Sequence, residues 1–165
     1  MAALKIMGAT LAACSLLLAP AATAARILSF SPAHQPAPQI APGVPVRLTN
    51  GTTRIQLDNG AIAAFVGAAD FTLHGAGQMD LRSGTVTITS AGRALVELGM
   101  PGGIRGVISG PGSAARFTAK ANGGRGAVLA GVVIIISRNG ERPFTAGQFW
   151  TADASRVMQH RDEAG

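Results

Sequence analysis

The stretch GAVLAGVVIIIS, residues Gly126–Ser137, carries the clearest fold signal in this chain. No residue between Val128 and Ile136 has a polar side chain, yet the run has only about half of the roughly 20 apolar residues that a membrane-spanning helix needs. It does not alternate between apolar and polar residues, as a membrane barrel strand does. Its β-branched residues VVIII, beginning at Val132, favour an extended strand over a helix. The sequence therefore predicts a strand that is buried on both faces.

From residue 46 onward, short β-rich runs alternate with turn residues. Within several runs the apolar residues occupy every second position, as Ile55 and Leu57 do, which is typical of half-buried strands. Turn signals separate the runs at intervals of about 8 to 12 residues, the spacing of all-β domains. The pattern predicts one all-β domain over residues 46–150. It leaves a sandwich and a solenoid open, because no strict repeat period selects one of them.

The first 25 residues have the organisation of a secretory signal peptide. One positive charge, Lys5, precedes an apolar region at residues 6–18, and small residues follow at 22–24. We expect cleavage after Ala24 and a periplasmic or otherwise extracytoplasmic location. A second interpretation is a lipoprotein signal, in which Cys14 becomes a lipid anchor and the protein is an outer-membrane lipoprotein. The apolar residues that follow Cys14 argue against this second interpretation.

Two flanking segments are expected to lie outside the domain. Residues 26–45 are predicted to be a proline-rich linker, since five prolines within residues 31–45 fix the backbone and remove hydrogen-bond donors. Residues 151–165 are predicted to form a weak helix capped by Thr151 or Asp153, or a frayed tail, because they offer little apolar surface to bury.

The composition narrows the classes of partner. The arginines are scattered along the sequence, and the chain has one Trp and no Tyr, so we expect no nucleic-acid partner. The only cysteine is Cys14, so a chain cleaved after Ala24 has neither a disulfide nor a thiolate zinc site. The formal net charge of +6 fits a soluble cationic surface or attraction to an anionic component of the cell envelope.

The titratable residues show no catalytic or metal-binding pattern. His74 has no second ligand at a suitable spacing, so we expect an exposed turn residue and no metal site. Asp70 and Asp80 lie on adjacent predicted strands and are the best candidates for a glycosidase-like carboxylate pair. However, Asp58 and Asp70 occupy positions where carboxylates usually bond the local backbone, and Asp80 is expected to face solvent. We therefore predict no catalytic residue, no cofactor and no metal.

Five segments together resemble the FecR-type β-domain, the extracytoplasmic part of the ferric-citrate regulator and its relatives. They are RIQLDNG (54–60), FTLHGAGQMDLRSGTVTIT (71–89), ISGPGSAARFTA (108–119), VLAGVVIII (128–136) and FTAGQ (144–148). The family-motif positions are Leu57, Gly60, Leu81, Gly84, Phe117, Leu129, Gly131, Val133, Gly147 and Gln148. The resemblance implies a β-solenoid-like fold, with a β-sandwich as the alternative. In that fold the opening stretch forms one rung, and Gly131 permits tight packing between rungs.

The sequence departs from this family at two points. The Gly-Thr site of the family is replaced by GPGS at residues 110–113. Signalling members of the family carry a cytoplasmic anti-sigma segment and a transmembrane helix before the β-domain, where this sequence has an export signal and a proline-rich stretch. The resemblance therefore carries over the fold but not the transcriptional role.

The expected function is that of an exported, non-catalytic FecR-domain module of a bacterial cell envelope. Its partner would be a glycan or an envelope protein, such as the periplasmic domain of an outer-membrane receptor, and exposed strand edges would pair with an extended segment of it. We expect no membrane span in the mature chain. One alternative is a periplasmic signalling component related to FecR-type sigma-factor regulation of iron or surface-signal uptake. Another is an enzyme that acts on envelope polysaccharide through Asp70 and Asp80.

Overall fold

The computed structural model describes residues 25–31 and 37–160, which form eleven strands and one short 3-10 turn. The elements are β1 (Ala25–Phe30), β2 (Pro45–Leu48), β3 (Thr52–Leu57), β4 (Ile62–Gly75), β5 (Gln78–Thr89), β6 (Val96–Met100), η1 (Pro101–Gly103), β7 (Ile104–Lys120), β8 (Gly123–Ser137), β9 (Gly140–Thr145), β10 (Phe149–Asp153) and β11 (Val157–His160). The prediction of a single all-β domain is confirmed.

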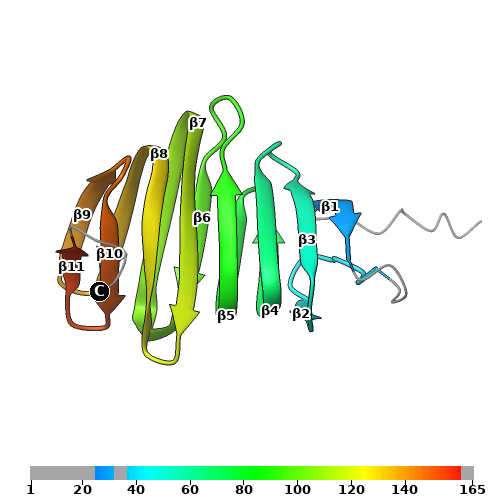
Figure 1. Cartoon of the computed structure of the whole chain (residues 1–165), viewed down its shortest axis with the longest axis horizontal. Helices are drawn as coiled ribbons and strands as arrows, with labels where there is room; N and C mark the ends of the chain where they lie inside the picture. Colours follow the sequence, from blue (N-terminus) through cyan, green and yellow to red (C-terminus); the bar gives the residue numbers. More distant parts are fainter. Residues whose placement is uncertain (1–24, 32–36, 161–165) are drawn as a thin grey trace, which may run out of the picture.

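The strands form one open sheet whose members follow one another along the long axis of the molecule (Figure 1). The path runs β1-β3-β4-β5-β6-β7-β8-β10-β11, with β2 paired to β4 and β9 paired to β8. The pairs are antiparallel except for β5–β6, which is parallel. The structure has features of both predicted architectures. Its strands succeed one another along one axis, as in a solenoid, and they pair antiparallel, as in a sandwich.

The four longest strands, β4, β5, β7 and β8, each bend and contribute to two layers. For example, β4 pairs with β3 through residues 62–66 and with β2 through residues 69–72. Layer A contains β1, β3, β10, β11 and residues 62–66, 84–89, 114–120 and 123–128 of the long strands. Layer B contains β2, β6, β9 and residues 69–73, 78–81, 104–109 and 132–137 of the long strands.

The core lies between the two layers and contains most of the large apolar side chains. Phe65 of layer A stacks on Phe71 of layer B, with ring centroids 4.3 Å apart. Phe117 of layer A faces Gly106 of layer B so closely that a Cβ on Gly106 would lie 2.5 Å from the phenyl ring. The layers therefore share one continuous apolar core, whose burial drives their association.

Each bend of a long strand contains at least one glycine with a positive φ angle. These glycines are Gly67, Gly84, Gly110, Gly112 and Gly131. At Gly84 the φ angle is 97°, and a Cβ would lie 2.5 Å from the Ala68 carbonyl oxygen. Other residues are disfavoured there both by backbone conformation and by close contact.

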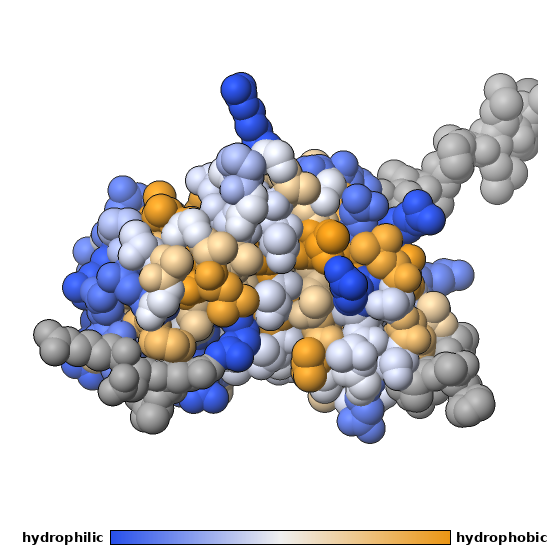
Figure 2. All heavy atoms as spheres, turned by 45° about the horizontal axis from the view of Figure 1, so that its top comes forward, coloured by the Kyte–Doolittle hydropathy of each residue, from blue (hydrophilic) through white to orange (hydrophobic). Residues whose placement is uncertain are grey.

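The apolar run of β8 forms a strand, as predicted, but it is not buried on both faces. Val133 and Ile135 are buried in the core, whereas Val132 on the opposite face is 45% exposed. Ile134 and Ile136 lie on that opposite face and are half-buried. One face of β8 is partly exposed because the outer face of layer B has no third layer to cover it. Figure 2 shows apolar patches between hydrophilic residues on one face of the molecule.

The expectations for both ends of the domain need correction. β1 lies inside the segment expected to be a linker and pairs with β3, so the sheet begins before the proline-rich stretch. No helix or frayed tail is found over residues 151–160: β10 and β11 form a hairpin that extends layer A. The edge of β8 provides backbone partners for β10, and this pairing overrides the weak helical preference of the segment.

Some expectations fall on parts of the chain that the structure does not describe. The signal peptide up to Ala24, with Cys14, lies outside the described residues, as do residues 32–36 and the last five residues. Within the described part of the chain, no helix has the length and apolar character needed to cross a membrane.

Candidate functional site

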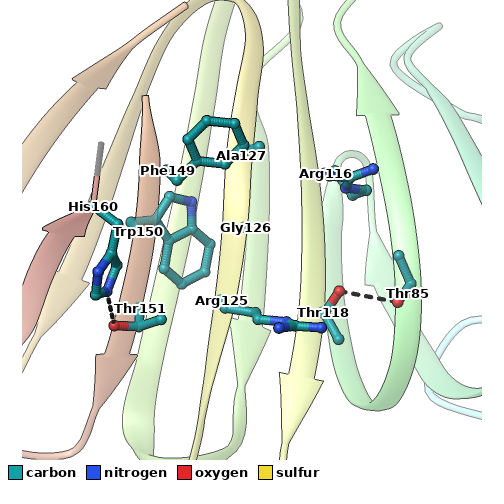
Figure 3. A pocket seen from close by; sticks show the side chains of 10 residues that line it. All are labelled: Thr85, Arg116, Thr118, Arg125, Gly126, Ala127, Phe149, Trp150, Thr151 and His160. Carbon is teal, nitrogen blue, oxygen red and sulfur yellow. Dashed lines mark hydrogen bonds between the residues drawn. The ribbon is translucent and has the colours of Figure 1, made fainter. Parts of the chain in front are cut away.

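A pocket on the outer face of layer A is the best-formed candidate site, and we call it the arginine pocket (Figure 3). Its volume is about 280 Å³. It is lined by Thr85, Arg116, Thr118, Arg125, Gly126, Ala127, Phe149, Trp150, Thr151 and His160. These residues come from β5, β7, β8, β10 and β11, which are far apart in the sequence but adjacent in layer A.

The register of layer A explains why these side chains meet. Thr85 is opposite Thr118, which is opposite Arg125, which in turn is opposite Thr151, so the four form one row across the sheet. A second row, two residues along each strand, contains Arg116, Ala127, Phe149 and His160. Residues in paired positions share one face of a sheet, so both rows project to the outer side of layer A.

The floor of the pocket is shaped by Gly126 and Trp150. A Cβ on Gly126 would meet the Arg116 carbonyl oxygen and lie 2.7 Å from the indole ring, so only glycine fits at this position. The Trp150 side chain is buried, with 1% of the residue exposed, and packs against Phe117 with ring centroids 5.8 Å apart. Its Nε1 is a buried donor without a hydrogen-bond partner among the described residues. Such a group is uncommon in proteins and calls for a physical explanation.

The two walls of the pocket differ in chemistry. Phe149 and His160 lie on the side formed by β10 and β11, and Thr85, Thr118 and Arg116 lie on the side formed by β5 and β7 (Figure 3). The Thr85 and Thr118 hydroxyl groups lie 3.0 Å apart. The Thr151 hydroxyl lies 2.7 Å from Nε2 of His160. The hydroxyl groups are thus held in place by neighbours while retaining further hydrogen-bonding capacity.

The pocket is basic. Arg116 is half-buried and Arg125 is exposed, and no carboxylate lines the pocket among the described residues. Asp153, two residues beyond Thr151 on β10, is engaged in the turn to β11. Hydrogen bonds from the Ser155 hydroxyl and backbone N–H lower the pKa of Asp153, and its carboxylate also lies 3.8 Å from Nε of Arg156. The described side chains that line the pocket therefore include two arginines and no carboxylate.

The outer face of layer B carries a row of charged residues in place of a basic pocket. His74 Nε2 lies 2.7 Å from the Asp80 carboxylate, and Arg105 lies 2.8 Å from the Glu97 carboxylate. Three of the four side chains are exposed, and that of Glu97 is partly buried. Arg105 and Glu97 form an ion pair on this face, and His74 and Asp80 form a hydrogen bond.

The structure separates the aspartates that the sequence analysis paired. Asp70 and Asp80 do lie on adjacent strands, β4 and β5. However, Asp70 lies 3.4 Å from Arg47 of β2, whereas Asp80 interacts with His74. Asp58 is exposed in the turn after β3. The hydrogen bond with Asp80 was not anticipated for His74, which lies near the end of β4 and is exposed.

Most of the family-motif positions lie in the core, at strand bends or in turns. Leu57, Leu81, Phe117 and Val133 are buried in the core. Gly84 and Gly131 lie at strand bends, and Gly60 and Gly147 lie in turns with positive φ angles. The Gln148 side chain accepts a hydrogen bond of 2.7 Å from the Thr145 N–H and closes the β9–β10 turn. Leu129, by contrast, is 52% exposed beside the β8 bend.

The sequence analysis did not identify the arginine pocket. A signal for part of it exists in the alternation of TVTIT at 85–89 and ARFTA at 115–119, where every second residue is polar. That alternation places threonines and an arginine on one face of two strands. The contributions of Thr151 and His160 could not be found this way, because residues 151–165 were expected to lie outside the domain.

The edges of the sheet differ in their capacity for further strand pairing. Layer A ends at β1 and β11, and layer B ends at β2 and β9. Pro45 in β2 and Pro143 in β9 each remove a backbone donor from the layer B edges. An extended partner segment would therefore find more complete pairing at β1 or β11.

The described residues contain no cluster of three or more His, Cys, Asp or Glu side chains that could hold a metal ion. No protein-family model and no curated protein matches this chain.

Two crystal structures from Parabacteroides distasonis ATCC 8503, each described as "a putative anti-sigma factor", have a similar fold. One matches with a TM-score of 0.56 at 7% identity, and the other with a TM-score of 0.55 at 8% identity. Each match covers 73% of this chain but only 62% and 61% of the respective structures. At this level of identity the comparison shows a shared fold alone.

Proposed function

We propose that this chain is an exported, non-catalytic binding module of FecR type in a bacterial cell envelope, and that it engages a protein or glycan partner. The observation that carries the proposal is the arginine pocket, in which two arginines and three threonine hydroxyl groups face one hollow. A concave site with a few convergent polar groups is the usual form of a ligand-binding site. Asp70 and Asp80 have separate side-chain partners, Arg47 and His74, which gives no support to a shared catalytic role for these two carboxylates.

The position of β1 supports the export part of the proposal. β1 begins at Ala25, immediately after the expected cleavage site, so cleavage after Ala24 leaves the whole sheet intact. Amino-terminal sequencing of the protein from its native cells tests this part. A mature chain that begins at Ala25 supports it. A mature chain that begins at a lipid-modified Cys14 would show instead that the protein is a lipoprotein.

The binding proposal is tested by placing a photoreactive amino acid on the exported full chain. Val66 is 63% exposed and is opposite Thr85 in the register of layer A, so it lies beside the arginine pocket. Leu95, 54% exposed in the loop after β5, is a matched control that does not line the pocket. We expect crosslinking to a defined envelope component from Val66 but not from Leu95. Equal capture from both positions, or none from either, contradicts a partner bound at this face.

A second candidate function is signalling, as a freestanding periplasmic component related to FecR-type regulation of iron or surface-signal uptake. It is favoured by the shared fold with structures described as anti-sigma factors, which extends over 73% of this chain. Under this function, the crosslinked component is the periplasmic domain of an outer-membrane receptor. Deletion of the gene would then alter the transcriptional response to that receptor's signal. If deletion leaves the transcriptional response unchanged and the captured component is a glycan, the signalling function is rejected and the glycan partner is supported.

A further inference from the structure

We infer that two copies of this chain associate through β11, whose free edge pairs antiparallel with the same edge of the second copy and joins the two sheets across a two-fold axis. The inference goes beyond the proposed binding function and does not depend on it. It is carried by three properties of β11: its lack of edge protection, the direction of its free backbone groups and the side chains on its two faces.

Of the four edges of the described sheet, β11 alone has none of the usual obstacles to further pairing. Proteins protect edge strands with prolines, bulges and charged side chains. β2 and β9 contain Pro45 and Pro143. β1 has a bulge between Ile27 and Ser29 and carries the exposed Arg26. β11, with the sequence VMQH, has no proline and no Lys, Arg, Asp or Glu, and its register with β10 is unbroken. It therefore presents a regular edge to a further strand.

The free backbone groups of β11 belong to Val157 and Gln159. The Asp153 N–H donates to the Arg156 carbonyl oxygen over 3.0 Å and closes the β10–β11 hairpin. Hydrogen-bonded and non-hydrogen-bonded pairs alternate along an antiparallel ladder, so Met158 directs its N–H and C=O toward β10. Val157 and Gln159 therefore direct theirs away from β10, to the place where a further strand would lie.

This arrangement of donors and acceptors is self-complementary. When a second β11 lies antiparallel to the first with Met158 opposite Met158 of the partner subunit, Val157 comes opposite Gln159 of the partner subunit. The two-fold axis generates the same pair a second time. Each of these pairs can exchange both of its free backbone hydrogen bonds. An interface of this isologous kind closes on itself, so it gives a dimer and not a fibre.

The side chains of β11 agree with this register. Val157 is half-buried and packs against the core, so a second copy would cover its remaining exposed surface. Met158 is half-buried on the outer face of layer A, opposite Thr151, and would meet Met158 of the partner subunit at the axis. Like charges placed opposite each other destabilise a strand pair, and β11 has no Lys, Arg, Asp or Glu to bring against its own copy.

A second copy would cover more of this end of the molecule than a single peptide strand would. β9 of layer B lies at the same end as β11 (Figure 1), and the Arg142 side chain donates to that of Gln159 over 3.5 Å. A second copy would face the edges of both layers, whereas an added peptide strand would face layer A alone. Because β11 has only four residues, the interface is small and the dimer should depend on concentration.

A single cysteine at position 158 tests the register. Cys14→Ser removes the only cysteine of the chain and provides the background. Residues opposite each other in a non-hydrogen-bonded pair have Cα atoms about 4.5 Å apart, within the range of roughly 4.4–6.8 Å that a disulfide spans. Under mild oxidation, Met158→Cys should give a disulfide-linked dimer in about tenfold higher yield than Leu28→Cys. Leu28 is the matched control, since it is 42% exposed on β1, the other edge of layer A.

Sedimentation equilibrium of the exported, unmodified protein measures the association itself. We expect the mass to rise from that of one chain toward about twice that value over a roughly hundredfold rise in concentration. Met158→Lys places two like charges opposite each other at the axis and should weaken the association by about tenfold or more. Leu28→Lys is the matched control and should leave it unchanged. Thermal melting of both variants checks that each is folded.

Three results would overturn the inference: a monomer at every concentration, unchanged association of Met158→Lys, or equal disulfide yields from the two cysteine variants. Weakening by Leu28→Lys in place of Met158→Lys would move the contact to β1 and also reject it. A chain that stays monomeric while Met158→Cys captures a different envelope protein would make β11 a site for a foreign strand and reject the second copy. Crosslinking from Val66 is a separate measurement, so the proposed binding function is supported or rejected independently.

Discussion

At the scale of single residues, glycines determine where this sheet can fold over. The bends of the long strands combine positive φ angles with different amounts of surrounding space. At Gly84 a Cβ would lie 2.5 Å from the Ala68 carbonyl oxygen and 2.7 Å from Cα of Ala69. At Gly67, whose φ angle is 77°, a Cβ would have no neighbour within 4 Å. A side chain at Gly67 would therefore meet only the cost of the backbone conformation, whereas a side chain at Gly84 would meet that cost and a steric clash as well.

We predict that Gly84→Ala destabilises the protein more than Gly67→Ala does. A left-handed conformation costs an alanine about 1–2 kcal/mol, which is partly offset by the lower entropy of its unfolded chain. We expect a loss of about 1 kcal/mol for Gly67→Ala and of more than about 2 kcal/mol for Gly84→Ala, because only the second adds a clash with backbone. Urea denaturation measures both free energies of unfolding. Equal losses would show that the bend of β5 is wider than the structure indicates.

At the scale of elements, β8 shows how one apolar run serves two environments. Its residues alternate between the core and the outer face of layer B, so two consecutive valines differ in burial. Val133 is fully buried, whereas Val132 is 45% exposed. Threonine has nearly the shape of valine and a similar preference for strands, so it changes polarity with little change in packing or backbone.

We predict that Val133→Thr lowers the free energy of unfolding by about 1–3 kcal/mol, since a hydroxyl group would be placed in the apolar core. The matched variant Val132→Thr should change it by less than about 0.5 kcal/mol, as is usual for an exposed site. Chemical denaturation of the two variants gives the comparison. Similar losses for both would restore the expectation of a strand buried on both faces, and the opposite order would mean a register shifted by one residue.

At the scale of the whole molecule, the carboxyl-terminal hairpin completes layer A and one wall of the arginine pocket. β11 pairs with β10 over four residue pairs, from Phe149–His160 to Ala152–Val157. The side chain of Arg142 on β9 lies 3.5 Å from that of Gln159 on β11, which links the two layers at this end of the sheet. The structure therefore makes this segment part of the folded domain.

Removal of residues 156–165 should lower the melting temperature by roughly 5–10 °C, because it deletes β11 and leaves β10 as an unpaired edge. It should also change the emission of Trp150, which lies on β10 and is buried. Removal of residues 161–165 alone is the control, since it retains β11. If the longer deletion melts at the same temperature and has the same emission, β11 contributes nothing to the fold.

The sequence by itself determined the fold class, because the two-residue alternation of apolar side chains and the frequent turn residues are local properties of a β chain. It also identified the apolar run at Val128–Ile136 as a strand from its length and β-branching. Only the tertiary structure decided which strands are neighbours, since backbone pairing joins segments that are distant in the sequence. That pairing turned residues 151–160 into strands and left one face of β8 partly exposed. It also brought Arg116, Arg125 and Phe149 together in one pocket, because the register across β7, β8 and β10 is set by the whole sheet and by no local pattern.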